Sequence, residues 1–513
     1  MSDGQSRRYI ERRLVQNSGL IVAARIVTAS LSLAAIPVVV ARLGVSGYGA
    51  WESLVALASL ASIFQAAISA TLVWRVSAAF GAKDVGEILR TARVGATATL
   101  VLAAILWPGA WALRHVLVRF LQVPPEFQTT AAAAFPILAG IFLLSGLCDT
   151  LEAVVSGSQR SGLVNVVGAI GVAGNYTVVI VALTCGAGLW GLVAGQGVGF
   201  LVRLAGASAA ARYAHGPVSL VPALPRRSDL AAARYSGLML LGIVAQGLRD
   251  QTDKIVLAAL ASALWVGYYG IATRLASLVL EVSRFFYVPM LTAAGALNGA
   301  GDWLGVRQLY SRMMAVVSSL TGLVLVVTAG LAAHLVVLWM GKPIPEVLPL
   351  LWILITGSAS AVMLTGPGTA LCRGIGRVGI ETTYLAFKLV SNLGLTIGLV
   401  LLIGARGTVV ATGVTWAVSS VLFVVVLHRQ LDLPVRATWR AAGTALVAAA
   451  VTIAACGISQ WFALPMTRRE AILPLALLAS ASAAAYGAAL FGLRLVSITT
   501  VRGGLRRLRA SAI

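Results

Sequence analysis

Seven charged side chains lie inside two neighbouring apolar segments of this 513-residue chain: Arg249, Asp250, Asp253, Lys254, Arg274, Glu281 and Arg284. A charge at membrane depth costs at least ~2.5 kcal/mol, so such residues usually face a cavity or an oppositely charged partner. On a helix, Arg249 and Asp253 are four residues apart and can form an ion pair. The same spacing joins Asp250 and Lys254. The pattern indicates a polar path through a bilayer.

Bases outnumber acids in this set by four to three, and Arg25 and Lys388 add two membrane-depth bases without a local acid. Mutual neutralisation explains the matched charges, while the excess of base indicates an anionic ligand or open water. Arginine suits a phosphate because its planar guanidinium forms paired hydrogen bonds and stays protonated. The candidate binding residues are Arg25, Arg249, Arg274, Arg284 and Lys388. The candidates for a coupling ion are Asp250, Asp253 and Glu281.

Three other acids have a plainer explanation. Asp149 and Glu152 lie near the inner end of one apolar segment, and Glu52 lies near the outer end of another. Anchoring at the membrane interface, or pairing with arginines in the loops, accounts for them.

Composition identifies a polytopic membrane protein, because 59% of the residues are hydrophobic and 11% are charged, against roughly 25% charged in soluble domains. Positive loops on the cytoplasmic side of a membrane explain the net charge of +22, so we expect no nucleic-acid partner. The sequence has no phosphate-binding loop ending in Gly-Lys-Ser/Thr and no cysteine or histidine spacing of a metal site. We therefore expect no enzyme, catalytic residue, metal or cofactor.

Segment lengths predict an all-α protein with about fourteen transmembrane helices. The spans are expected near 18–43, 48–75, 90–112, 129–156, 162–184, 188–211, 232–259, 264–293, 308–333, 346–371, 379–403, 407–430, 438–460 and 470–493. With the N-terminus inside, the cytoplasmic segments hold 24 Lys and Arg and the outer segments hold 7. This asymmetry predicts that both termini lie in the cytoplasm.

Two halves of the chain repeat weakly. Tyr48 corresponds to Tyr269 at a shift of 221 residues, and Arg160 and Asn175 correspond to Arg377 and Asn392 at a shift of 217. We therefore expect two six-helix pseudo-repeat lobes plus two C-terminal helices. The expected parts are a basic cytoplasmic N-terminus (1–17), an N-lobe of spans 1–6 (18–211), a cytoplasmic linker (212–231), a C-lobe of spans 7–12 (232–430), spans 13–14 (431–493) and a basic cytoplasmic tail (494–513).

Several short motifs occur along the chain: Arg42-Leu43-Gly44, Gly47-Tyr48-Gly49, Asp253-Lys254-Ile255-Val256-Leu257, the stretch 266–275, Pro289 and Gly301-Asp302. Together they resemble the motifs of the polysaccharide (O-antigen) flippases of the multidrug/oligosaccharidyl-lipid/polysaccharide (MOP) exporter superfamily. The resemblance runs along nearly the whole chain and is strongest at 17–80 and 246–302. Each motif is short, and their order and spacing carry the match.

The resemblance implies two lobes around a cationic cavity lined by spans 1, 2, 7 and 8. It also implies a polyprenyl-diphosphate-linked oligosaccharide as cargo, such as a repeat unit of lipopolysaccharide O-antigen or exopolysaccharide for the cell envelope. The resemblance further implies that the cargo crosses the bacterial inner membrane by alternating access. From the residues themselves, we expect Asp250, Asp253 and Glu281 to bind the proton or Na⁺ that couples transport to the membrane potential. We expect membrane lipids and a polysaccharide polymerase as partners.

Other functions stay open. Lipid II flippases of the superfamily typically carry an Arg-Asp pair in span one, whereas Arg25 is followed by Ile26. A multidrug antiporter for cationic drugs favours acids over bases in its cavity. A membrane-embedded polysaccharide polymerase or ligase normally has a large outer loop, and the longest outer loop here, near 113–128, is short.

Overall fold

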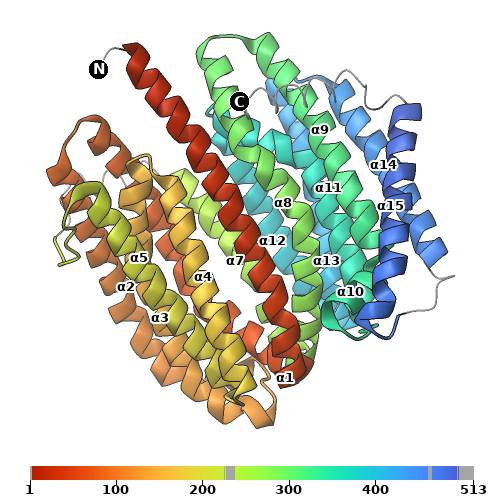
Figure 1. The fold of residues 1–513 in the computed structure, drawn as a ribbon, viewed down its shortest axis with the longest axis horizontal. Helices are drawn as coiled ribbons and strands as arrows, with labels where there is room; N and C mark the ends of the chain where they lie inside the picture. The colour runs from red at the N-terminus through yellow and green to blue at the C-terminus, as the bar shows by residue number, and fades with distance from the viewer. Residues whose placement is uncertain (1–2, 225, 227–236, 460–464, 494, 496–513) are drawn as a thin grey trace. The chain divides into compact units, whose positions relative to one another are not determined.

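The computed structural model describes residues 3–224, 226, 237–459, 465–493 and 495. Within these ranges the chain forms helices and no strands (Figure 1), which confirms the predicted all-α class. The helices are α1 (Asp3–Gly81), α2 (Val85–Phe120), α3 (Pro125–Gly157), α4 (Ser161–Thr184), α5 (Gly188–His215), α7 (Gly237–Leu260), α8 (Ala263–Gly299), α9 (Trp303–Gly330), α10 (Ala332–Met340), α11 (Val347–Gly374), α12 (Val378–Ile403), α13 (Arg406–Leu431), α14 (Val435–Ser459) and α15 (Arg468–Gly492).

Helix α1 contains the first two predicted spans, joined at a kink. Gly44 has φ 73° and ψ 173° there, a conformation open to glycine and strained for other residues. Each remaining predicted span overlaps one long helix. Thirteen segments of the described chain are long and apolar enough to cross a membrane. Helix α7 is also long enough at 24 residues, but its four charges keep it out of that count.

The chain packs into two compact units, unit 1 from Met1 to Gly267 and unit 2 from Tyr268 to Ile513. In unit 1, α1 packs against α2, α3, α4 and α7, and α4 lies beside α5. In unit 2, α12 lies beside α13, and α9 packs against α11 and α14. The sequence repeat predicts that the two lobes divide in the linker 212–231. The boundary between the two packed units lies later in the chain, and it assigns α7 to unit 1. The contacts between α1 and α7 described below explain this assignment.

The repeat is visible in the backbone of two turns, one in each unit. Arg160 and Arg377 are the N-cap residues of α4 and α12. Each follows a residue with positive φ, Gln159 at 63° and Gly376 at 77°. The amide of each arginine donates to the carbonyl five residues earlier, at 3.2 Å and 2.8 Å respectively. The turns are therefore equivalent at the predicted shift of 217 residues.

Candidate functional site

A buried ion pair joins α1 to α7 in unit 1. The Lys254 ammonium donates to a carboxylate oxygen of Glu52 at 2.5 Å. The side chains are 19% and 9% exposed, so each charge needs its partner because neither is well solvated. Glu52 is thus a partner of α7, which corrects its interpretation as an interface anchor or a partner of loop arginines.

Two glycines bring α1 and the start of α8 into backbone contact near this pair. A Cβ added at Gly49 would lie 1.7 Å from the carbonyl oxygen of Ala263. A Cβ added at Gly267 would lie 2.3 Å from the carbonyl oxygen of Val45. Both glycines belong to the motifs that carry the sequence resemblance. Their absent side chains allow the close approach, which places Glu52 within reach of Lys254.

The other predicted residues of unit 1 surround this pair on α7. Asp253 is buried at 5% exposure, and Arg249 is half-buried one turn earlier. Arg25 lies on α1 and Asp250 on α7, but their side chains are outside the described part of the chain. Unit 1 therefore gathers Glu52, Arg249, Asp253 and Lys254 on two contacting helices.

In unit 2, the predicted residues lie on α8 and α12. Arg274 and Glu281 are half-buried on α8, seven residues and thus about two turns apart. Arg284 also lies on α8, with its side chain outside the described residues. Lys388 of α12 is buried at 7% exposure. The roles of all these residues in binding or coupling stay predictions.

Lys388 lies in an aromatic and hydroxyl environment. Its Nζ atom is 5.4 Å from the ring centroid of Tyr384 and 5.1 Å from that of Trp416. It also donates to the Tyr384 hydroxyl at 3.2 Å. Ring faces and a hydroxyl oxygen stabilise a cation, so these contacts help to hold the ammonium of α12 against α13.

A stripe of buried polar residues continues from Lys388 along α12 and α13, and the sequence reasoning missed it. Its members are almost fully buried: Asn392 at 2%, Thr396 at 0%, Thr412 at 2%, Thr415 at 1% and Ser419 at 0%. The signal was present in the spacing, since Tyr384, Lys388, Asn392 and Thr396 recur every four residues in an apolar segment. Such spacing places polar groups on one helix face.

Unit 1 holds a second charged cluster between α3 and α5. Arg203 donates to both carboxylate oxygens of Glu152 at 2.7 Å and to Asp149 at 2.6 Å. The partner of these acids is therefore an arginine inside α5, not a loop arginine as one of the two sequence interpretations held. Two carboxylates side by side repel each other, and the planar guanidinium between them offsets that repulsion.

No protein-family model matches the chain, and no curated protein matches its sequence. Solved structures do share its fold. The lipid II flippase MurJ in an inward closed conformation matches with a TM-score of 0.68 and 12% identity, over 93% of this chain and 100% of that one. An inward-facing multidrug resistance transporter of the MATE family, within the MOP superfamily, matches with a TM-score of 0.65 and 14% identity, over 80% and 98%.

A third structure comes from Pyrococcus furiosus. It is a MOP superfamily transporter in which the reverse polarity of the binding pocket suggests a different function. It matches with a TM-score of 0.58 and 14% identity, over 82% of this chain and 96% of that one. These likenesses show that the chain shares the fold of these three proteins, two of which are MOP superfamily transporters, in agreement with the fold that the sequence motifs predicted.

Proposed function

We propose that this protein is a flippase that moves a polyprenyl-diphosphate-linked oligosaccharide across the bacterial inner membrane by alternating access, with both termini in the cytoplasm. An O-antigen or exopolysaccharide repeat unit is the expected cargo. The observation that carries the proposal is the excess of base among the charged residues of the predicted site. Glu52 neutralises Lys254, which leaves five bases against three acids. They are Arg25, Arg249, Arg274, Arg284 and Lys388 against Asp250, Asp253 and Glu281.

The cargo's chemistry complements this charge. A diphosphate is a compact polyanion, and arginine binds it through paired, charge-assisted hydrogen bonds. The prenyl tail is apolar and stays in the lipid while the headgroup crosses. In this proposal Arg249 and Arg274 hold the diphosphate. Asp253 and Glu281 exchange a proton or Na⁺, so that the gradient across the membrane drives release.

The fold supports transport over catalysis, because the solved structures that share it are transporters. The lipid II flippase structure matches a larger part of this chain, 93%, than the MATE structure does, 80%. A multidrug antiporter is the second candidate, since MATE transporters have the same fold. The excess of base disfavours it, because a cationic drug is attracted to acids and repelled by arginines.

Translocation in proteoliposomes tests the proposal. The purified protein is reconstituted with a fluorescent polyprenyl-diphosphate oligosaccharide, and the fraction protected from an external glycosidase is followed with time. Arg249→Ala and Arg274→Ala should each slow translocation at least tenfold, since a hydrogen bond to a charged group contributes about 1.5–3 kcal/mol. Arg249→Lys and Arg274→Lys should recover part of the rate, because a point charge replaces the bidentate guanidinium.

Arg436→Ala is the matched control, because Arg436 is an exposed arginine at the start of α14. It should translocate at the wild-type rate. Wild-type rates in both alanine variants would refute the assignment of the arginines. Transport of a cationic dye, with no movement of the lipid-linked glycan, would favour the antiporter.

A further inference from the structure

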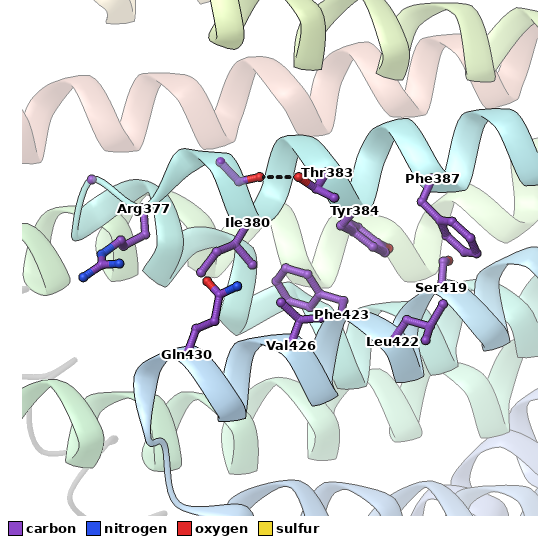
Figure 2. Close-up of a pocket in the computed structure, with 12 residues that line it drawn as sticks. Arg377, Ile380, Thr383, Tyr384, Phe387, Ser419, Leu422, Phe423, Val426 and Gln430 are labelled. Carbon is purple, nitrogen blue, oxygen red and sulfur yellow. Dashed lines mark hydrogen bonds between the residues drawn. The ribbon is translucent and has the colours of Figure 1, made fainter.

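An apolar groove runs between α12 and α13 in unit 2. It has a volume of about 550 Å³. Figure 2 shows Arg377 and Gln430 at one end, with Ile380, Phe423 and Val426 following along its length. Phe387 and Leu422 lie at the far end and are 43% and 44% exposed. The groove is therefore open along a largely apolar, helix-lined face. Its only charged lining residue, Arg377, lies at one end, and the hydroxyl residues Thr383, Tyr384 and Ser419 lie farther along it.

A polar pocket of about 460 Å³ adjoins this end. Arg377 and Gln430 line both the groove and the pocket, and Arg307, Asn298 and Asp432 complete the pocket's polar lining. Arg307 forms an ion pair with Asp432, so the acid is neutralised. The Nε atom of Arg307 is buried and has no hydrogen-bond partner among the described residues. The pocket thus offers donors and one uncompensated cation, Arg377.

Arg160, the arginine of unit 1 that is equivalent to Arg377, has different surroundings. The Arg160 guanidinium lies over the Tyr213 ring, 4.9 Å from its centroid. Arg377 instead lines the groove and the polar pocket, and no ion pair or ring contact is found for it among the described residues. The two equivalent turns therefore present their arginines differently, and the arginine of unit 2 is available to an anion.

We propose that an anionic phospholipid of the cytoplasmic leaflet binds here, with one acyl chain in the groove and its phosphate against Arg377 in the polar pocket. The groove runs along α12 from Arg377 to Phe387, ten residues or ~15 Å at the helical rise. This is half the ~30 Å thickness of the hydrocarbon core, and so the depth of one leaflet. Basic pockets between membrane helices on the cytoplasmic side bind anionic headgroups, and the loop charges assign this end of α12 to that side.

Lipid retention by the detergent-purified full chain tests this site. Native mass spectrometry compares the binding of added phosphatidylglycerol with that of phosphatidylcholine of the same acyl chains. The wild-type protein should retain one phosphatidylglycerol in preference to phosphatidylcholine. Arg377→Gln should weaken this binding about fivefold, as expected for one basic residue near a phosphate, and should leave the weak binding of phosphatidylcholine unchanged.

A second variant fills the groove without changing charge. A Cβ at Gly379 meets no atom within 4 Å, so Gly379→Leu places its side chain in the groove and should displace the acyl chain. Gly394→Leu is its matched control, because Gly394 is on the same helix, also has open space and does not line the groove. Arg436→Ala is the control for Arg377→Gln. Both controls should retain the lipid as the wild type does.

Equal retention of the two lipids by the wild type would overturn the proposal, because the groove would then hold bulk lipid. Unchanged phosphatidylglycerol binding in both Arg377→Gln and Gly379→Leu would also overturn it. If the wild type gave the mass of a dimer and Gly379→Leu gave the mass of a single chain, the groove would instead be a contact between two copies of the protein. None of these results depends on transport, so the proposed function stands or falls separately.

Discussion

Removing the charge of Glu52 tests the ion pair between α1 and α7. Glu52→Gln keeps the size of the side chain and an acceptor oxygen, but it leaves the Lys254 ammonium without its counter-charge. Lys254 is 19% exposed and Glu52 is 9% exposed, so little water reaches the orphaned charge. We therefore expect Glu52→Gln to destabilise unit 1.

The magnitude follows from the burial of the pair. Breaking a fully buried pair by removing one partner costs ~3–5 kcal/mol, whereas an exposed pair contributes ~0–1 kcal/mol. The exposures place this pair near the buried limit, and the glutamine oxygen still accepts a hydrogen bond. The expected loss is therefore about 3 kcal/mol, or ~100-fold in the unfolding equilibrium.

Denaturant unfolding in mixed micelles, followed by tryptophan fluorescence, measures this loss. The double variant Glu52→Gln/Lys254→Met should recover most of the stability, because it removes the unpaired charge as well. The four-member cycle of wild type, singles and double isolates the pair energy. Glu126→Gln, at an exposed position in the first turn of α3, should stay within ~0.5 kcal/mol of the wild type.

Two results would refute this reasoning. One is a Glu52→Gln protein within ~0.5 kcal/mol of the wild type, the usual range for surface substitutions. The other is a double variant as unstable as the single, which would mean that the carboxylate acts through something other than its charge on Lys254.

Two further substitutions probe contacts of unit 1. Gly49→Ala puts a Cβ 1.7 Å from the Ala263 carbonyl oxygen, so the backbones must separate. The variant should be at least ~2 kcal/mol less stable in the same unfolding assay, and wild-type stability would contradict the contact. Arg203→Ala leaves Asp149 and Glu152 repelling each other and should lower the free energy of unfolding by ~3 kcal/mol or more in the same assay. Arg203→Lys should recover part of the lost stability, because it restores the positive charge. If the two variants were equally stable, the charge of Arg203 would not be what stabilises this cluster.

The sequence predicted the helices well, because each span is a long apolar segment and needs no knowledge of its neighbours. It predicted that Arg160 corresponds to Arg377, and the structure has equivalent turns at these two positions, because local backbone geometry recurs with local sequence. It also predicted that charges lie inside α7 and α8. Each of these features is determined by the residues of a single segment of the chain.

The partners of the charges could not be predicted in the same way. Periodicity along α7 offers Lys254 the acid four residues away, yet the structure pairs it with Glu52, 202 residues earlier. Arg203 reaches Glu152, 51 residues away, through the packing of α5 on α3. Such pairs depend on which helices pack together, and that depends on small residues such as Gly49, whose importance appears only when the opposing backbone is known.

The shared turn before α4 and α12 bears on how an internally duplicated protein diverges. Main-chain hydrogen bonds and a left-handed residue hold each turn, so its shape does not depend on what the arginine side chain contacts. Selection can then act on that side chain alone. In one copy the guanidinium lies over Tyr213, and in the other it lines a groove. Two turns with the same backbone geometry can thus acquire different side-chain chemistry without any change in the main chain that holds them.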